Sequence, residues 1–526
     1  MELLELSLLL LVIAGTVTAI AKKLNIAYPI ALVIVGALVG VTPISGLEEL
    51  KAFAVKEGVF QFAIIFLFLP ALLGEASFKM PFEKLFINKK PILLLAVLST
   101  AISYLIVGFA SMHWLGLSVQ AAFTFAALMA ATDPVSVISI FKSIGVNERL
   151  AVIMEGESLI NDGLAYVLFI ISSTMLLVYL DMGALGIGYG VLEFLKVVCG
   201  GLAIGGIFGY VFSKLTRMFD DYPLEILFSI ILFYGSFIVA EAFHVSEVIA
   251  VVTAALILGN YGSKIGMSAT TKLNLNSFWD TLALIANSIV FLMVGLEINR
   301  IDWISHTSSI VLAIIIVVVA RTLAVYGSVG FVKEISWKWK HVFNWGGLRG
   351  SLSIALALSL PLDFPYREKM IVLAFSVVFF SLIVQGLTIK KLVQWLKINS
   401  DHPKLQAYEE YVARFQRYQV GINKLNRLKE QAILSPVLHE EMVQAYQEKM
   451  EKTRHDIDQL YQENPMLQAE EQLIAQNQML YDEHEAIEDL EKREIISKQV
   501  AERHRLELIE KIEQNQSAIH ELEEKM

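Results

Sequence analysis

An acidic island lies in the otherwise apolar stretch 151–180. It consists of Glu157, Ser158, Asn161 and Asp162, in which the first and third residues, and likewise the second and fourth, are four positions apart. Side chains with this spacing lie on the same side of a helix, so they form one compact, oxygen-rich group. An acid within a membrane span is costly and is by default a functional-site hypothesis. The group favours binding of a proton or a hard cation.

A transition-metal site is not indicated here. The chain has a single cysteine, Cys199, and stretch 151–180 has no paired histidines, whereas transition-metal sites use these ligands. The alternative is a structural role in which the polar side chains join helices by hydrogen bonds. Helix packing does not need an ionisable acid, so we expect an ion site.

Two other apolar stretches contain helix-breaking residues near their centres. In 118–141, Asp133 precedes Pro134, whose ring collides with a preceding carbonyl and pushes Asp133 away from helical geometry. In 341–360, Arg349 lies within the glycine-rich run GGLRGS. Broken backbone at membrane depth lines a cavity or is buried in protein, and in transporters it presents carbonyls and helix ends to ions. We therefore expect two interrupted helices.

The composition predicts an all-α polytopic membrane protein. The chain has 526 residues, of which 56% are hydrophobic, and its mean hydropathy is +0.59. This is too apolar and too long for one ordinary soluble domain. Windows of about 17 to 25 apolar residues, the length that crosses the hydrocarbon core, suggest about thirteen spans near 4–21, 27–43, 58–78, 91–112, 118–141, 151–180, 186–213, 223–243, 246–262, 279–298, 308–331, 341–360 and 370–396.

The order of the spans predicts an internal symmetry. The interrupted helices are the fifth and twelfth spans, so they run in opposite directions, and each is the middle of a triplet. This arrangement is expected of an inverted repeat whose binding site lies where the broken helices cross. Lysines and arginines concentrate in connectors that follow odd-numbered spans, such as Lys22 and Lys23. The positive-inside rule then places the N-terminus outside and the C-terminus in the cytoplasm.

Arg321 is a further charge within span 308–331. An unpaired cation there would be as costly as an unpaired acid, so a buried partner is expected, and Glu157 is the best candidate. Either Arg321 or Arg349 could neutralise Glu157. In both cases Asp162 remains as the acid that is free to titrate. A proton and a metal ion then compete for one desolvated carboxylate. Coupled to alternating access, that competition produces antiport.

Residues 1–397 are predicted to form the transmembrane domain, and 398–526 an acidic, helical cytoplasmic domain. Its composition is rich in Glu, Gln, Lys and Leu, and Pro436 and Pro465 should end helices. Near-heptad spacing suggests an amphipathic helix or a short coiled coil, with apolar positions Leu473, Leu480 and Ile487. A helical hairpin that packs on itself and a regulatory or partner-binding domain are the two interpretations.

Four stretches of residues 5–395 resemble the cation:proton antiporter-1 family, which includes NhaP-type and NHE-type sodium/proton exchangers. They are FTFAALMAATDPVSVISIFKSIGVNERL, GESLINDG, LPALLGEASFKMP and GGLRGSLSIALALSLP. The resemblance implies a thirteen-helix transporter with a dimerisation domain and a moving core of six helices. It also implies a homodimer that works by an elevator-like cycle.

The resemblance further assigns roles to individual residues. Asp162 would carry the ion and the proton, while the other residues lining or completing the site would be Thr132 (through its backbone carbonyl), Asp133, Ser158 and Glu75. Asn161 and Glu157 would stabilise the site, the latter by an ion pair with arginine; Arg321 is favoured for this pair and Arg349 for the broken helix. The Asn161–Asp162 pair is the version associated with electroneutral exchange.

These observations predict a secondary antiporter, not an enzyme, that exchanges Na⁺ for H⁺, with Li⁺ and K⁺ as alternatives. We expect it in the plasma (bacterial inner) membrane, and it needs no cofactor. Nucleic acid is not an expected partner, because there is no basic surface to neutralise phosphates. A gated cation channel or membrane sensor using the same acidic site is the alternative, and a scaffold tethered by an inert transport fold is a third reading.

Overall fold

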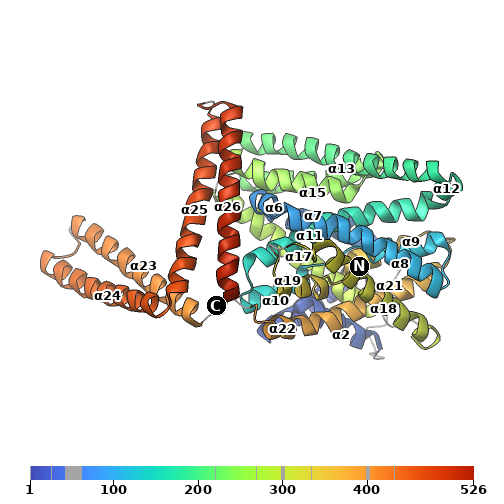
Figure 1. Cartoon of the computed structure of the whole chain (residues 1–526), viewed down its shortest axis with the longest axis horizontal. Helices are drawn as coiled ribbons and strands as arrows, with labels where there is room; N and C mark the ends of the chain where they lie inside the picture. Colours follow the sequence, from blue (N-terminus) through green and yellow to red (C-terminus); the bar gives the residue numbers. More distant parts are fainter. Residues whose placement is uncertain are drawn as a thin grey trace. The chain divides into compact units, whose positions relative to one another are not determined.

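The structure, a computed structural model, describes residues 2–24, 27–41, 62–219, 221–267, 269–297, 303–332, 335–398, 403–431, 433–493 and 495–525. These residues are predominantly helical and include no β-strand. The chain divides into two compact units, Met1–Ile398 and Asn399–Met526, and many helices of each are labelled in Figure 1. The division falls one residue from the boundary expected from composition.

The described part of the first unit consists of α-helices and five short π-helical segments (η), each continuous with at least one α-helix. In chain order the elements are α1 (Glu2–Lys23), α2 (Tyr28–Val41), η1 (Phe62–Phe68), α5 (Leu69–Lys79), α6 (Phe82–Ile87), α7 (Lys89–Leu93), η2 (Leu94–Ser99), α8 (Thr100–Trp114), α9 (Val119–Leu128), α10 (Val135–Ile144), α11 (Glu148–Ile170), η3 (Ile171–Met175), α12 (Leu176–Asp181), α13 (Ala184–Met218), α14 (Tyr222–Ala242), α15 (Glu247–Ile257), η4 (Leu258–Gly262), α16 (Ser263–Ile265), α17 (Ala269–Glu297), α18 (Trp303–Val329), α19 (Trp337–Trp345), α20 (Ser351–Leu358), α21 (Arg367–Phe380), η6 (Ser381–Gln385) and α22 (Gly386–Trp395).

Many of these helices suit a membrane. Within the described ranges, eight helical stretches are long and apolar enough to cross it: Lys89–Trp114, Arg149–Asp181, Gly188–Met218, Tyr222–Ala242, Glu247–Ile265, Thr271–Leu296, Ser305–Val329 and Arg367–Trp395. Two shorter apolar helices are Tyr28–Val41 and Val119–Leu128. The protein is therefore a multi-pass membrane protein. The windows expected at 27–43 and 58–78 extend into 42–61, outside the described residues, and the count of thirteen stays a prediction.

Both expected helix breaks are present. Between α9 and α10 the chain leaves helical geometry at residues 129–134, and between α19 and α20 it does so at 346–350. Pro134 directly precedes α10, where its missing N–H costs no helical hydrogen bond. The glycine-rich run that follows α19 supplies the second break.

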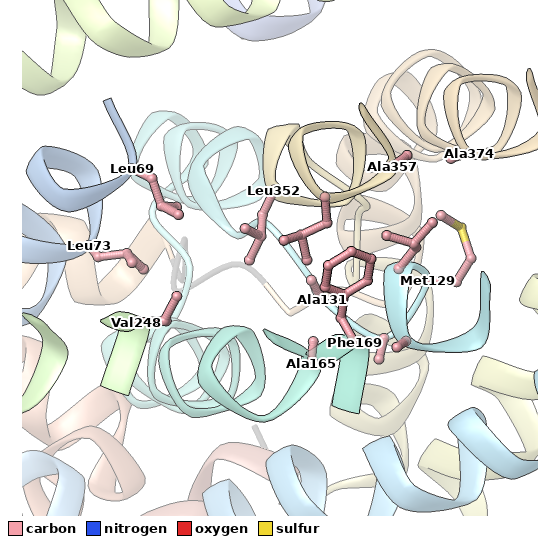
Figure 2. Packing of buried hydrophobic residues seen from close by; sticks show 14 of the residues in the cluster. Leu69, Leu73, Met129, Ala131, Ala165, Phe169, Val248, Leu352, Ala357 and Ala374 are labelled. Carbon is pink, nitrogen blue, oxygen red and sulfur yellow. The ribbon is translucent and has the colours of Figure 1, made fainter. Parts of the chain in front are cut away.

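A cluster of buried apolar side chains packs between these broken helices and their neighbours. Figure 2 shows members contributed by α5, α11, α15 and α20, and by the segment after α9. Many members are alanines, which let helix backbones approach closely. The labelled residues include Leu69, Leu73, Ala131, Ala165, Phe169, Val248 and Leu352.

The second unit consists of two helical hairpins. Helices α23 (Pro403–Glu430) and α24 (Pro436–Glu463) form one, and α25 (Pro465–Lys492) and α26 (Lys498–Lys525) form the other. Pro436 and Pro465 lie in the first helical turn, where proline is tolerated. Where the hairpins join, the hydroxyls of Tyr408 and Tyr461 donate to the two carboxylate oxygens of Glu471. Burial raises the pKa of the Glu471 carboxyl above its usual value.

Candidate ion-binding site

Polar side chains of α11 bind the interrupted backbone that follows α9. The Ser158 hydroxyl donates to the carbonyl of Thr132. The Asn161 amide nitrogen donates to the carbonyl of Ala130 at 2.7 Å and contacts the Thr132 hydroxyl at 3.2 Å. A helix break leaves buried carbonyls without intrahelical partners, and such groups must find hydrogen bonds elsewhere. The residue pattern of α11 therefore stabilises the break beside it.

The two breaks meet through the main chain. The amide of Asp133 donates to the carbonyl of Leu348 at 2.8 Å. The Asp133 carboxylate then accepts the amide of Val135 at 2.9 Å, in the first turn of α10. Residue 350 approaches Asp133 so closely that it must be glycine, since a Cβ on Gly350 would lie 2.3 Å from the Cβ of Asp133. The broken helices thus contact one another directly at the acid expected to bind a cation.

Arg349 stabilises the first break from the second. Its Nη1 donates to the carbonyls of Ala131 at 3.1 Å and Ala130 at 3.3 Å. These carbonyls follow the C-terminal end of α9, where the helix dipole favours a cation. The backbone amide of Arg349 donates to the Ser381 hydroxyl at 2.9 Å. With only 3% of its surface exposed, this arginine belongs to the framework of the site.

Arg321 is the ion-pair partner of Glu157. The Arg321 Nη1 and Glu157 Oε1 are 2.7 Å apart, and the two residues are 5% and 2% exposed. The second guanidinium nitrogen donates to the carbonyl of Phe343 at 2.9 Å. The lack of a side chain at Gly347 leaves room for the Arg321 guanidinium, because a Cβ on Gly347 would lie 2.7 Å from Nη2 of Arg321. The pair thereby neutralises one acid of the island.

A cavity of about 720 Å³ reaches the island. Its lining includes five carboxylates and two lysines, namely Glu75, Asp133, Glu155, Asp162, Asp280, Lys22 and Lys79. Leu69, Leu73, Leu159 and Leu352 line the cavity and also belong to the buried apolar cluster. An excess of negative charge with apolar walls concentrates cations in such a cavity.

Asp162 differs from the other acids of the island in its hydrogen bonding. Its Oδ1 is buried and has no hydrogen-bond partner within the described part of the chain. Nearby oxygens come from Ser158, one turn earlier on α11, and from the Thr132 carbonyl that Ser158 contacts. Buried polar atoms without partners are rare and need an explanation. Asp162 lines the cavity, and its unpartnered oxygen can take a proton or a cation.

The structure places Glu75 on the cavity wall, where it is engaged by a lysine. Lys79 Nζ lies 2.6 Å from Glu75 Oε1 and also bonds Asp280 on α17. Sequence reasoning had not identified either partner. Their only signal is the spacing of Glu75 and Lys79, four apart on one helix.

Thr100 is a second residue that sequence reasoning missed. It begins α8, directly after η2, and donates to Asn161 Oδ1 at 2.8 Å. This bond orients the Asn161 amide so that its nitrogen faces the broken segment. A single threonine within an apolar span is too common a pattern to predict such a role.

Comparison with known proteins identifies the family of this chain. Residues 8–395 match the model of the family described as sodium/hydrogen exchanger, transmembrane. The chain is 53% identical over 508 residues to the Na⁺/H⁺ antiporter NhaG of Bacillus atrophaeus, covering 97% of both chains. It is 56% identical over 389 residues to the Na⁺/H⁺ antiporter NhaH of Halobacillus aidingensis, covering 74% of this chain and 96% of that one.

Among solved structures, the fold is similar to that of the sodium proton antiporter MjNhaP1 from Methanocaldococcus jannaschii. The TM-score is 0.60, and the match covers 75% of this chain and 99% of that chain. The sequences are 22% identical over this match. The similarity supports the architecture of the first unit.

Proposed function

Because this chain belongs to the sodium/hydrogen exchanger family, we propose that Asp162 is the group that carries Na⁺ and H⁺ in turn across the membrane. The protein is a secondary Na⁺/H⁺ antiporter, and so a transporter rather than an enzyme. The observation that carries the assignment is the unpartnered, buried Oδ1 of Asp162 at the end of the cavity.

The two neighbouring acids support the choice of Asp162, because each already has a partner. Glu157 is paired with Arg321, and Asp133 accepts the Val135 amide at the start of α10. Of these three acids, only Asp162 has a fully buried oxygen without a hydrogen-bond partner in the described part of the chain. Because a proton and a cation need the same oxygen, occupancy by one excludes the other, which is the requirement for exchange.

Oxygen atoms around Asp162 would complete a Na⁺ site. Ser158 and the Thr132 carbonyl are the first candidates, since they lie against each other beside Asp162. A bound cation would take the lone pairs of both oxygens, and the Ser158 hydroxyl hydrogen would turn away. Asp133 would contribute negative charge, and Glu75 would complete the site once Lys79 leaves it. Oxygen ligands of this kind suit hard cations.

The packing supports a moving core. The triplet of spans four to six packs on that of spans eleven to thirteen, with α18 against α8 and α20 against α9. The remaining helices form their own contacts, with α2 against α17 and α13 against α15. We propose that the triplets are the inverted repeats of a thirteen-helix unit and move as a core relative to the other helices, in a homodimer and in an elevator-like cycle.

The cavity supports an orientation. Lys22 and Lys79 line it, and both lie at helix ends that carry an excess of lysine. The positive-inside rule then makes the cavity face the cytoplasm, with the N-terminus outside and the C-terminus inside the plasma (bacterial inner) membrane. One carrier carboxylate next to Asn161 means that one Na⁺ replaces one H⁺, so exchange would be electroneutral.

The second unit is proposed to be a cytoplasmic, regulatory addition that exchange does not require. The Halobacillus aidingensis antiporter matches over 389 residues and 96% of its own length, a length that the first unit alone could supply. The Bacillus atrophaeus relative matches 97% of this chain, so that relative also contains a segment similar to the second unit.

The test is proton flux in proteoliposomes with an imposed pH gradient and a clamped membrane potential. Addition of Na⁺ should collapse the gradient in the unmodified protein, and Li⁺ and K⁺ added in turn would define selectivity. Asp162→Asn should abolish the response while remaining folded. Asp181→Asn, at the exposed end of α12, is the matched control and should respond normally. Cation-driven proton flux through folded Asp162→Asn would remove the carrier assignment, and cation leak without proton movement would restore the channel alternative.

A further inference from the structure

A second buried carboxylate lies beyond the end of the cavity. Along α11 the cavity is lined by Glu155, Ser158, Leu159 and Asp162, and its lining on this helix stops there. Tyr166 follows one turn later, on the same side of α11 as Asp162.

The side chain of Tyr166 reaches α15. It interacts with the carboxyl group of Glu247, in the first turn of that helix.

Glu247 is more than a helix-capping acid. The cap of α15 is Ser246, whose hydroxyl accepts the amide of Ile249 at 3.2 Å. Glu247 is 7% exposed, and its Oε2 finds no hydrogen-bond partner in the part of the chain that the structure describes. The nearest other acid is Glu241, exposed near the end of α14. The position therefore has excess acid and one unused, buried ligand atom.

The start of α15 packs against α11 through apolar residues. Val248 of α15 belongs to the same buried apolar cluster as Ala165 and Phe169 of α11 (Figure 2). The two helices are in tight contact, since a Cβ on Gly163 would lie 2.8 Å from the Ile249 side chain. A carboxylate in such a place is costly unless it is neutralised by a proton or a cation.

We propose that Glu247 and the Tyr166 hydroxyl form a second binding station for a proton or a small alkali cation, on the side of Asp162 opposite the cavity. The proposal rests on the proposed role of Asp162 as carrier. Within this proposal, a proton neutralises Glu247 while its carboxyl group is buried. When α11 shifts against α15 and exposes Asp162 to the outer side, both Glu247 oxygens become available to Na⁺, one helical turn from the carrier.

The station predicts an effect on one face of the membrane only. The experiment compares right-side-out and everted membrane vesicles that contain the full-length protein, and measures the Na⁺ concentration for half-maximal exchange at each face. Glu247→Gln should raise this concentration about tenfold at the outer face, equal to the loss of roughly 1.4 kcal/mol of binding. At the cytoplasmic face it should stay within about twofold. Tyr166→Phe, which loses only the hydroxyl, should give a smaller increase of about threefold, also at the outer face only.

Two controls separate the station from other causes. Glu241→Gln removes the neighbouring exposed acid; if it matches Glu247→Gln, the effect is surface charge and the proposal is wrong. If Glu247→Gln does not fold, Glu247→Asp keeps the charge with a shorter reach and should still raise the outer value more than the inner. Equal changes at both faces, or no change at either, would overturn the station. Asp162→Asn abolishes exchange at both faces, so failure of the carrier proposal is recognised separately.

Discussion

Replacing Glu157 by glutamine leaves Arg321 as a buried cation without a counter-ion. The two side chains are 2.7 Å apart and 2% and 5% exposed, so water cannot compensate for the lost charge. Breaking a buried pair on one side costs roughly 3 to 5 kcal/mol. We therefore expect Glu157→Gln, and equally Arg321→Met, to lower the free energy of unfolding by about this amount.

The double variant should behave differently from either single one. With both charges removed, only the bond from Arg321 to the Phe343 carbonyl is lost, which is worth about 1 kcal/mol. The double variant should therefore be more stable than either single variant, with a coupling energy of about 5 kcal/mol or more. Folded Glu157→Gln protein should still exchange Na⁺ for H⁺, in contrast to Asp162→Asn.

The assay is reversible unfolding in mixed detergent micelles, followed by tryptophan fluorescence, since α19 contains Trp339 and Trp345 near the pair. The matched control is Glu193→Gln, which breaks an exposed ion pair with Lys196 and should cost less than about 1 kcal/mol. A loss below about 1 kcal/mol in Glu157→Gln, or a double variant no more stable than the singles, would refute the reasoning.

Three further predictions concern the crossing and the second unit. Asp133→Asn should raise the Na⁺ concentration for half-maximal exchange several-fold, because it removes a negative charge from the site; unchanged Na⁺ dependence in flux assays would contradict this. Gly350→Ala should reduce Na⁺ affinity by about tenfold or more, since its Cβ would fall 2.3 Å from Asp133, whereas Gly206→Ala, with open space around it, should be neutral in the same titration. A chain that ends at Ile398 should retain exchange in proteoliposomes, and complete loss of flux in a folded, truncated protein would make the second unit essential.

The helix breaks and the arginines could be anticipated because their signals are local. Proline at Pro134 and the glycines around Arg349 alter the backbone wherever they stand, so their effect can be read from a few residues. The expectation for Arg321 also needed only the cost of an unpaired charge in a membrane. The pair with Glu157 then follows from neutralisation.

The remaining features depend on packing that no local pattern specifies. Thr100 binds Asn161 across 61 positions of sequence, and the lysine that engages Glu75 also reaches Asp280 on another helix. Glu247 looked like an ordinary acid at the start of a helix, and only the burial of its Oε2 distinguishes it. The count of thirteen spans stays a prediction, since apolar length alone does not separate crossing helices from buried ones.

The main-chain bond from Asp133 to Leu348 has a mechanical consequence. It joins two segments that would otherwise be the weakest parts of their helices, and Arg349 adds a second tie between them. Force applied to either broken helix is therefore transmitted to the other instead of separating them. In the proposed elevator-like cycle, the ion site would therefore move as one rigid unit. Residues at the crossing would set the affinity for Na⁺, and sliding at the contact between α11 and α15 would set the rate of the conformational change.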